Sequence, residues 1–409
     1  MKKSILSLLA VIMVLALTIT GAMAEAATPI YSAEELFSSR DMKQEADLTD
    51  AVRYTLSDGQ DIHITTAGVY VLTGTAAGVT VYVEAGDDDK VQIVLDGANV
   101  TNADFPVIYA KNADKLFITT SADSSLTVTG TFASDGSTHT DGVIFARCDL
   151  VLNGTAALTI RSAENGIVGK DDLKITGGTY SITASSKAIQ ANDSIRIADG
   201  VLTLVAGTDG LHAENEDDDS LGYVYIGGGS LTIQAGDDGI HGTSVVQIDD
   251  GVLTISAKEG IEGTYIQING GTINIKSTDD GINAAQKSRS YTATVVINDG
   301  DITVAMSSGD TDGIDSNGDI IMNGGTVTVT GSSTFDYDGA AQYNGGTIIA
   351  NGQQLASIPT QMMGGRGGMN GGFGNMNGSF GGMNSGWGNT NTGWGGMNGG
   401  FGGFGGRGR

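Results

Sequence analysis

The residues best suited to chemistry in this 409-residue sequence are five acids that each precede a glycine and an aliphatic residue. The five steps are Asp209-Gly210-Leu211, Asp238-Gly239-Ile240, Glu259-Gly260-Ile261, Asp280-Gly281-Ile282 and Asp312-Gly313-Ile314. Their glycines are 29, 21, 21 and 32 residues apart, so the basic spacing is 21 residues with two longer intervals. Carboxylates at such intervals can bind a hard divalent cation if the fold brings them side by side.

A second polar position follows each of these acids by three residues. It holds His212, His241, Glu262, Asn283 and Asp315, and two steps carry an extra acid at Asp237 and Asp279. Oxygen ligands without cysteine and with few histidines favour Ca²⁺ over Zn²⁺, because Ca²⁺ takes about 6 to 8 oxygens. The predicted Ca²⁺ ligands are Asp237, Asp238, Glu259, Glu262, Asp279 and Asp280, followed by Asp209, Glu214, Asp312 and Asp315.

The stacking of these acids would carry an energetic cost. Equivalent positions of adjacent parallel strands lie about 4.8 Å apart, and like charges placed opposite one another are destabilising. At an effective dielectric constant of about 20, each uncompensated pair costs roughly 3 kcal/mol. A bound cation would remove that cost. The alternative is that each Asp-Gly step only makes a turn, with the aspartate capping the backbone and the glycine at positive φ. An isolated step favours the turn, whereas the dense acids around Glu259 and Glu262 favour the cation.

The elements that would position these acids are short strands. From about residue 61 to residue 357, alternating apolar runs are separated by Gly, Asn and Asp, and helical periodicity is absent. A repeat near 21 residues that contains three strands is typical of one coil of a parallel β-helix. We therefore predict an all-β solenoid of this kind. Its inward aliphatic side chains should form a buried ladder of Leu211, Ile240, Ile261, Ile282 and Ile314.

Four segments follow from this pattern: a signal peptide (1–24), an N-terminal lead-in (25–57), the β-helix (58–357) and a tail (358–409). Lys2 and Lys3, an apolar run and a small-x-small site ending at Ala24 are typical of an exported chain. An uncleaved anchor is the alternative, but the run is short for a membrane span. In the lead-in, residues 33–37 are expected to form a short helix. The tail, rich in Gly, Asn and Met, is expected to be disordered.

Composition narrows the possible partners. The net charge of −26 argues against nucleic acid and anionic lipid, since both require clustered Lys and Arg. Cys148 is the single cysteine, so no internal disulfide can form, and it is interpreted as a core residue. The expectation is a monomer that is secreted, either released or associated with the cell surface, and that has no membrane partner after cleavage.

Further segments give the chain a family resemblance. They are Gly68-Val69-Tyr70-Val71-Leu72-Thr73-Gly74, Val94-Leu95-Asp96-Gly97 and Lys170-Asp171-Asp172-Leu173, together with the repeated Asp-Gly-Ile units. With these, the sequence resembles the clostridial-type secreted carbohydrate-binding β-helix proteins. The resemblance implies a right-handed parallel β-helix, bound Ca²⁺, a pectate-lyase-like shape and binding to cellulose-like or pectin-like polysaccharide without established catalysis. The chain departs from the pattern at Lys187-Ala188-Ile189, where acid and glycine are lost, so no ligand is assigned there.

The expected function is calcium-dependent binding of an extracellular polysaccharide, with a uronate polymer favoured because the two tryptophans, Trp387 and Trp394, lie in the tail. Stacking on sugar would then rest on tyrosines, which are Tyr223, Tyr225, Tyr265 and Tyr291. Candidate sugar-contacting residues are His212, His241, Tyr265, Lys258 and Lys276.

Two alternatives stay open. A polysaccharide lyase would need a basic residue beside the metal, for which Lys258 and Lys276 are nearest by repeat position, although both also fit as surface residues. No catalytic residue is assigned. A structural or adhesive surface protein would bind through its tail instead.

Overall fold

The computed structural model describes residues 27–307 and 311–359. The predicted signal peptide and nearly all of the predicted tail lie outside the described residues. Within the described part of the chain, no helix is long and apolar enough to span a membrane. The described residues contain one short helix, α1 (Ala33–Leu36), and 34 strands.

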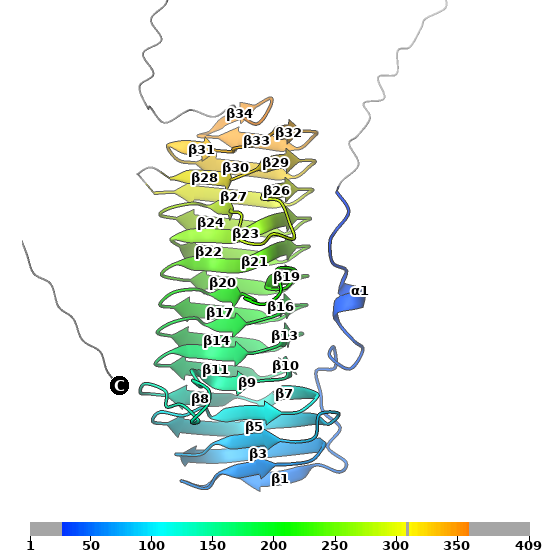
Figure 1. Ribbon diagram of the computed structural model, residues 1–409, viewed down its shortest axis with the longest axis vertical. Coiled ribbons are helices and arrows are strands. Elements are labelled where there is room, and N and C mark those ends of the chain that lie inside the picture. Colours follow the sequence, from blue (N-terminus) through cyan, green and yellow to red (C-terminus); the bar gives the residue numbers. More distant parts are fainter. Residues whose placement is uncertain (1–26, 308–310, 360–409) are drawn as a thin grey trace, which may run out of the picture. The chain divides into compact units, whose positions relative to one another are not determined.

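The strands stack as three parallel ladders, and the chain visits ladder 1, ladder 2 and ladder 3 in turn (Figure 1). Ladder 1 contains β1 (Val52–Thr55), the first parts of β3 (Gly68–Ala77) and β5 (Lys90–Asn102), β7 (Lys115–Ala122), β10 (Asp149–Gly154), β13 (Asp172–Ile175), β16 (Ser194–Ile197), β19 (Tyr223–Ile226), the second parts of β21 (Asp238–Ile248) and β23 (Glu259–Ile268), β26 (Thr294–Ile297), β29 (Asp319–Met322) and β32 (Ala341–Tyr343).

Ladder 2 contains the second parts of β3 and β5, β8 (Ser124–Val128), β11 (Ala157–Ser162), β14 (Thr179–Ala184), β17 (Val201–Ala206), β20 (Ser230–Gln234), β22 (Val252–Ala257), β24 (Thr272–Ser277), β27 (Asp301–Met306), β30 (Thr326–Thr330) and β33 (Thr347–Ala350). The last strand, β34 (Gln353–Leu355), pairs antiparallel with β33.

Ladder 3 contains β2 (Ile62–Ile64), β4 (Val81–Glu84), β6 (Ile108–Asn112), β9 (Gly142–Ala146), β12 (Asn165–Gly169), β15 (Ile189–Ala191), β18 (Leu211–Ala213), the first parts of β21 and β23, β25 (Ile282–Ala284), β28 (Asp312–Ser316) and β31 (Ser333–Phe335).

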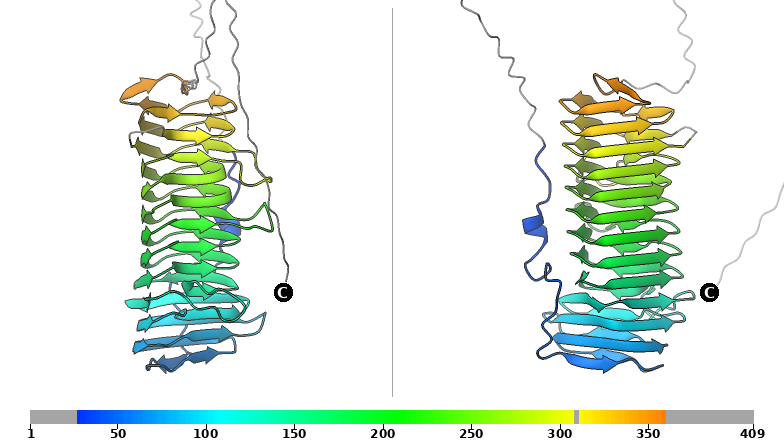
Figure 2. Two further views of the ribbon diagram at one scale, coloured as in Figure 1. Left: turned by 60° about the vertical axis from the view of Figure 1, so that its left-hand side comes forward. Right: turned by 180° about the vertical axis from the view of Figure 1, so that it is seen from behind.

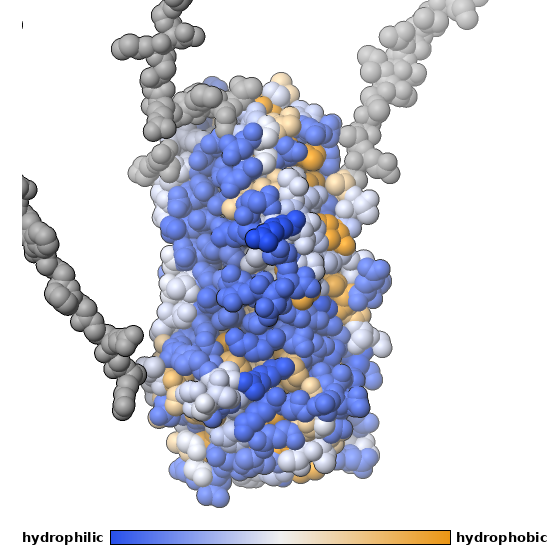
Figure 3. All heavy atoms as spheres, in the orientation of Figure 1, coloured by the Kyte–Doolittle hydropathy of each residue, from blue (hydrophilic) through white to orange (hydrophobic). Residues whose placement is uncertain are grey.

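The predicted parallel β-helix is therefore confirmed, and its interior follows the sequence pattern. Leu211 pairs with Ile240, Ile240 with Ile261, and the register continues to Ile282 and Ile314. All five side chains of this ladder are fully buried. On ladder 2, strands such as β17, β22 and β24 alternate strictly between exposed and buried residues. The face seen in Figure 3 is mainly hydrophilic, with small apolar areas interrupted by polar side chains.

The glycines of the acidic steps allow close approach between coils. Their φ values are not positive, unlike that of Gly271 in the turn between ladders 1 and 2, where φ is 89°. A Cβ added to Gly260 would lie 2.3 Å from the backbone oxygen of Gly281 and 2.5 Å from a methyl of Ile275. The turn explanation for these steps is wrong in this respect, because glycine is needed for space and not for a left-handed backbone.

The lead-in forms an N-terminal strap, residues 27–50, that runs along the outside of ladder 1 (Figures 1 and 2). Ladder side chains bind its backbone: Ala27 donates to the Asn298 side chain at 3.0 Å, and Tyr31 donates to the Gln247 side chain at 2.9 Å. The predicted short helix is present as α1 (Ala33–Leu36). The strap thus anchors to many coils at once.

The central attachment of the strap is a buried ion-pair cluster. Asp41, whose side chain is 1% exposed, lies 3.4 Å from Lys174 and 3.7 Å from Lys115. The Asp41 backbone oxygen also accepts a hydrogen bond from the Thr176 hydroxyl at 2.5 Å. Burial would raise the pKa of Asp41, but hydrogen bonds from Ser38 and the two lysines outweigh it and hold the pKa below its usual range. The strap is therefore an integral part of this domain.

Candidate functional site

The structure brings the predicted acids together on ladder 3, in the coils from β18 to β28. We call this surface the acidic face; its two columns are Asp209, Asp238, Glu259, Asp280 and Asp312, and His212, His241, Glu262, Asn283 and Asp315. Asp238 pairs with Glu259, and the second column pairs in register through every coil from His212 to Asp315. The backbones of residues that pair in this register lie one strand spacing apart, about 4.8 Å.

Acids of the first column also tie neighbouring coils together. The Asp209 carboxylate accepts a hydrogen bond from the backbone N–H of Asp238 at 3.2 Å, and Asp280 accepts one from Asp312 at 3.1 Å. Each bond links one coil to the next. Part of the acidic character of this column is thus structural.

The acidic face contains two chemically different clusters, one of which is built around two stacked histidines. The rings of His212 and His241 lie 4.6 Å apart with an interplanar angle of 15°. His212 lies 2.9 Å from Asp209 and 3.1 Å from Glu214, while Lys187 lies 3.9 Å from Asp209. We refer to Asp209, Asp238, His212, His241 and Glu262 as the histidine cluster.

His241 is the centre of the histidine cluster. Its Nδ1 lies 2.7 Å from Glu262 and 3.0 Å from Asp238. Burial disfavours the charged ring, but the hydrogen bonds to these two carboxylates prevail and raise the pKa of His241 to about 9. Burial would raise the pKa of Glu262. The hydrogen bonds and positive charges of His241 and of Lys287, which lies 2.8 Å away, outweigh burial and lower this pKa to about 2. An imidazolium and an ammonium therefore already supply the countercharge that the sequence argument assigned to a metal ion.

Three of the remaining acids, Glu259, Asp280 and Asp315, form the carboxylate cluster together with the amide Asn283. Burial is the main cause of the raised pKa values of its three acids, and neighbouring carboxylates raise them further. The pKa of Glu259 rises to about 7, that of Asp280 to about 6 and that of Asp315 to about 7. Among the described residues, the only basic group within 4.0 Å of these three carboxylates is Lys258, at 4.0 Å from Glu259.

One amide in the carboxylate cluster has an unused acceptor. Asn283 donates from Nδ2 to Glu259 at 3.0 Å, which directs its other polar atom, Oδ1, away from that hydrogen bond. Oδ1 is buried and has no hydrogen-bond partner in the described structure. A buried carbonyl oxygen without a donor costs about 1–3 kcal/mol, and a hard cation would satisfy it. The oxygen donors of this cluster therefore fit Ca²⁺.

Two groups in the described residues have ligand atoms that all lie within 4.8 Å of one another, and the acids of the carboxylate cluster, which are farther apart, are not among them. They are Asp238 with His241 and Glu262, and Asp209 with Asp237 and Asp238. The first group is occupied by the His241 imidazolium. In the second group, Lys258 lies 3.2 Å from Asp237 and His212 lies 2.9 Å from Asp209. Both groups are compact but already charge-compensated, so the carboxylate cluster has the greater electrostatic need for a cation.

The other predicted site residues are dispersed. Lys258, Asp237 and Asp279 form an exposed network beside the acidic face, with Lys258 3.7 Å from Asp279. Tyr265 lies on ladder 1, where it packs against Tyr291 with ring centroids 6.1 Å apart. A further tyrosine, Tyr223, stacks against the strap residue Tyr31 at 4.2 Å, so it is not an open sugar platform.

Lys276 lies on ladder 2, on an outward position of β24. The structure does not bring it together with the acidic face. Lys287, in contrast, contacts Glu262 directly and was not predicted. It lies in the long segment after β25, where no repeat position marks it, so no periodic signal could have identified it.

The fold and the acidic face define a parallel β-helix with a polyanionic surface on one ladder. The sequence matches the family described as carbohydrate-binding domain-containing protein over residues 58–311 and again over 261–354. Together these matches span most of the chain, which therefore belongs to this family.

Two known proteins are similar to parts of the chain. A carbohydrate-binding domain-containing protein from Acetivibrio thermocellus is 31% identical over 130 residues, which cover 31% of this chain and 46% of the relative. The alignment thus spans about half of that relative's length. A solved structure, the gadolinium derivative of a polysaccharide lyase-like protein from C. thermocellum, is 30% identical with a TM-score of 0.49. That match covers 55% of this chain and 96% of the other.

Proposed function

We propose that this protein is a secreted, non-catalytic polysaccharide-binding protein that holds acidic glycans through Ca²⁺ on its acidic face. Family membership supports carbohydrate as the partner. The observation that carries the calcium part is the carboxylate cluster, where three half-buried acids with raised pKa values lie on neighbouring coils together with the unsatisfied amide oxygen of Asn283. Secretion rests on the signal-like first 24 residues.

The residues proposed to hold the ion are Glu259, Asp280, Asn283 and Asp315. With one oxygen from each residue they would supply four of the about 6 to 8 ligands that Ca²⁺ takes. When bound, Ca²⁺ supplies open coordination positions that carboxylates of a uronate polymer can fill. Without the ion, the acidic face of this chain, whose net charge is −26, would repel a polyanion. Bound Ca²⁺ would offset that repulsion and allow a uronate polymer to bind there.

The basic residues considered for a lyase do not support catalysis. Hydrogen bonding to Asp237 is the main cause of a raised pKa at Lys258, so its amine stays protonated at neutral pH and is a poor base. Lys276 lies on another ladder. The proposal therefore treats the acidic face as a binding surface.

A retention assay on immobilised polygalacturonate, with Ca²⁺ and with EDTA, tests the proposal. The test variant is Glu259→Gln with Asp280→Asn. The control is Asp250→Asn with Asp299→Asn, which removes two carboxylates from exposed turns. We expect Ca²⁺ to increase the retention of the wild type and the control but not of the test variant.

An equal calcium-induced increase in both variants, or none in the wild type, contradicts the calcium proposal. Release of unsaturated products, detected by ultraviolet absorbance, contradicts the non-catalytic part.

A further inference from the structure

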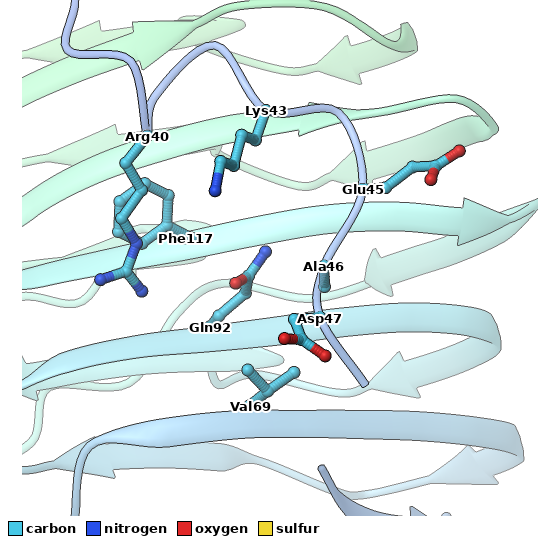
Figure 4. Close-up of a pocket in the computed structure, with 8 residues that line it drawn as sticks. All are labelled: Arg40, Lys43, Glu45, Ala46, Asp47, Val69, Gln92 and Phe117. Carbon is cyan, nitrogen blue, oxygen red and sulfur yellow. The ribbon is translucent and has the colours of Figure 1, made fainter. Parts of the chain in front are cut away.

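A pocket of about 410 Å³ lies between the N-terminal strap and the first coils of ladder 1 (Figure 4). Its floor consists of Val69, Gln92 and Phe117, which stand at equivalent positions of β3, β5 and β7. The strap forms the opposite wall with Arg40 and Lys43. The volume falls in the range of about 300–1,000 Å³ that is usual for small-ligand sites. Ladder 1 is a different ladder from the acidic face.

The two basic residues of the pocket are unusual for this acidic chain. Lys174 and Lys115, which also meet the strap, are paired with the buried Asp41. Arg40 and Lys43, in contrast, form no ion pair within 4.0 Å with any acid in the described ranges. The Arg40 guanidinium lies over the Phe117 ring, 4.5 Å from its centroid, which holds the side chain in place while its N–H groups stay available.

The pocket also offers hydrogen-bond acceptors. Gln92 donates from Nε2 to the Thr119 hydroxyl at 2.9 Å, so its carbonyl oxygen remains free to accept. Asp47 binds Thr49 through one carboxylate oxygen only, at 3.0 Å to the N–H and 2.7 Å to the hydroxyl. In Figure 4 the Glu45 carboxylate points away from the other lining side chains. Two cationic donors beside neutral and anionic acceptors match a ligand that carries both a carboxylate and hydroxyl groups.

We propose that this pocket is a second carbohydrate site, which binds a uronate unit of an acidic oligosaccharide without Ca²⁺. Arg40 and Lys43 hold the sugar carboxylate through charge-assisted hydrogen bonds, and the Gln92 oxygen accepts from a sugar hydroxyl. An adjoining cavity of about 240 Å³ shares Glu45 and Ala46 with the pocket, and three of its lining residues, Thr119, Ser121 and Thr155, bear hydroxyl groups. A second sugar unit meets further polar groups there, which favours an oligosaccharide over a free carboxylate.

This site does not depend on the calcium proposal. Its ligand is recognised by side-chain cations, whereas the acidic face requires an added ion. The two proposals are therefore separable: the acidic-face variant Glu259→Gln with Asp280→Asn retains the calcium-free site, and a pocket variant retains the calcium-induced increase in retention.

The test is calorimetric titration of the full chain with a galacturonate trisaccharide in EDTA. The pocket variant is Arg40→Gln with Lys43→Gln, and the control is Arg161→Gln with Arg289→Gln, which removes the same charge from exposed positions elsewhere. Because Arg40 and Lys43 are exposed, the pocket variant should keep the wild-type melting temperature, which is measured in parallel.

We expect the pocket variant to weaken binding by about tenfold or more, since charge-assisted hydrogen bonds are lost, and the control to bind like the wild type. A neutral glucose trisaccharide should bind more weakly than the galacturonate trisaccharide. No binding in EDTA, equal loss in the control, or equal binding of the neutral sugar overturns the proposal. Binding of galacturonate monomer or acetate as tightly as the trisaccharide overturns the assignment to an oligosaccharide.

Discussion

Two glutamates in β23, three residues apart, should respond in opposite ways to the loss of charge. Glu259 has a pKa raised from 4.5 to about 7, whereas Glu262 has a pKa lowered from 4.5 to about 2. We therefore expect Glu259→Gln to stabilise the calcium-free protein at pH 8 and Glu262→Gln to destabilise it. The two side chains are 15% and 8% exposed, so solvent screening does not erase the difference.

The magnitude follows from the pKa values. One pKa unit corresponds to about 1.4 kcal/mol, so ionised Glu259 costs the folded state roughly 3 kcal/mol at pH 8. Glutamine keeps an oxygen for the hydrogen bond from Asn283 and removes that charge. Because relaxation around the site reduces the effect, we expect a stabilisation of about 1 to 3 kcal/mol.

The pH dependence of the two variants also differs in sign. A carboxyl with a raised folded-state pKa favours the fold below its unfolded pKa and loses that contribution as pH rises, here between 4.5 and about 7. The advantage of Glu259→Gln should therefore shrink as pH falls towards 4.5. Glu262, with its lowered pKa, stabilises the fold above pH 4.5 and loses this contribution as pH falls towards about 2.

The assay is unfolding by urea in EDTA at several pH values, repeated with Ca²⁺. Calcium should stabilise the wild type more than Glu259→Gln, because the variant has lost a ligand. If Glu259→Gln destabilises the calcium-free protein as strongly as Glu262→Gln, the electrostatic division of the acidic face is wrong.

Three further predictions concern calcium, the strap and the coil contacts. Protons compete with Ca²⁺ for acids such as Glu259 and Asp315, so the calcium affinity measured by calorimetry should rise on the order of 100-fold between pH 6 and pH 8; a flat profile contradicts it. Asp41→Ala leaves Lys174 without its partner and should cost about 3–5 kcal/mol in unfolding experiments, whereas a loss below about 1 kcal/mol would mean that the strap contributes little. Gly260→Ala places a Cβ 2.3 Å from the backbone of the next coil, and it should lower the melting temperature more than Gly86→Ala, where the nearest atom is a flexible side-chain oxygen at 3.2 Å.

The coil architecture could be predicted from the sequence because each coil repeats the same pattern of apolar, polar and glycine positions. The interval of 21 residues and the aliphatic residue after each Asp-Gly step sufficed to place Leu211, Ile240 and Ile261 in one buried column. The register of the polar columns follows from the same geometry. One error concerned the step glycines, since their role depends on how closely neighbouring coils approach, which a single repeat does not reveal.

The charge pairing on the acidic face could not be predicted from the repeat. His241 and Lys287 neutralise Glu262, but Lys287 belongs to a segment between repeats and His241 was considered as a sugar contact. The contact between the strap and ladder 1 could not be predicted either, because Asp41 and Lys174 are more than a hundred residues apart in the sequence and share no pattern. Contacts between repeat and non-repeat segments carry no periodic signal.

The most direct test of the calcium proposal is an anomalous diffraction measurement on crystals of the full chain grown with Ca²⁺. We expect a peak bounded by Glu259, Asp280 and Asp315, with the Asn283 Oδ1 atom among the ligands. A peak confined to the histidine cluster or to Asp209, Asp237 and Asp238, or no peak on ladder 3, would contradict it.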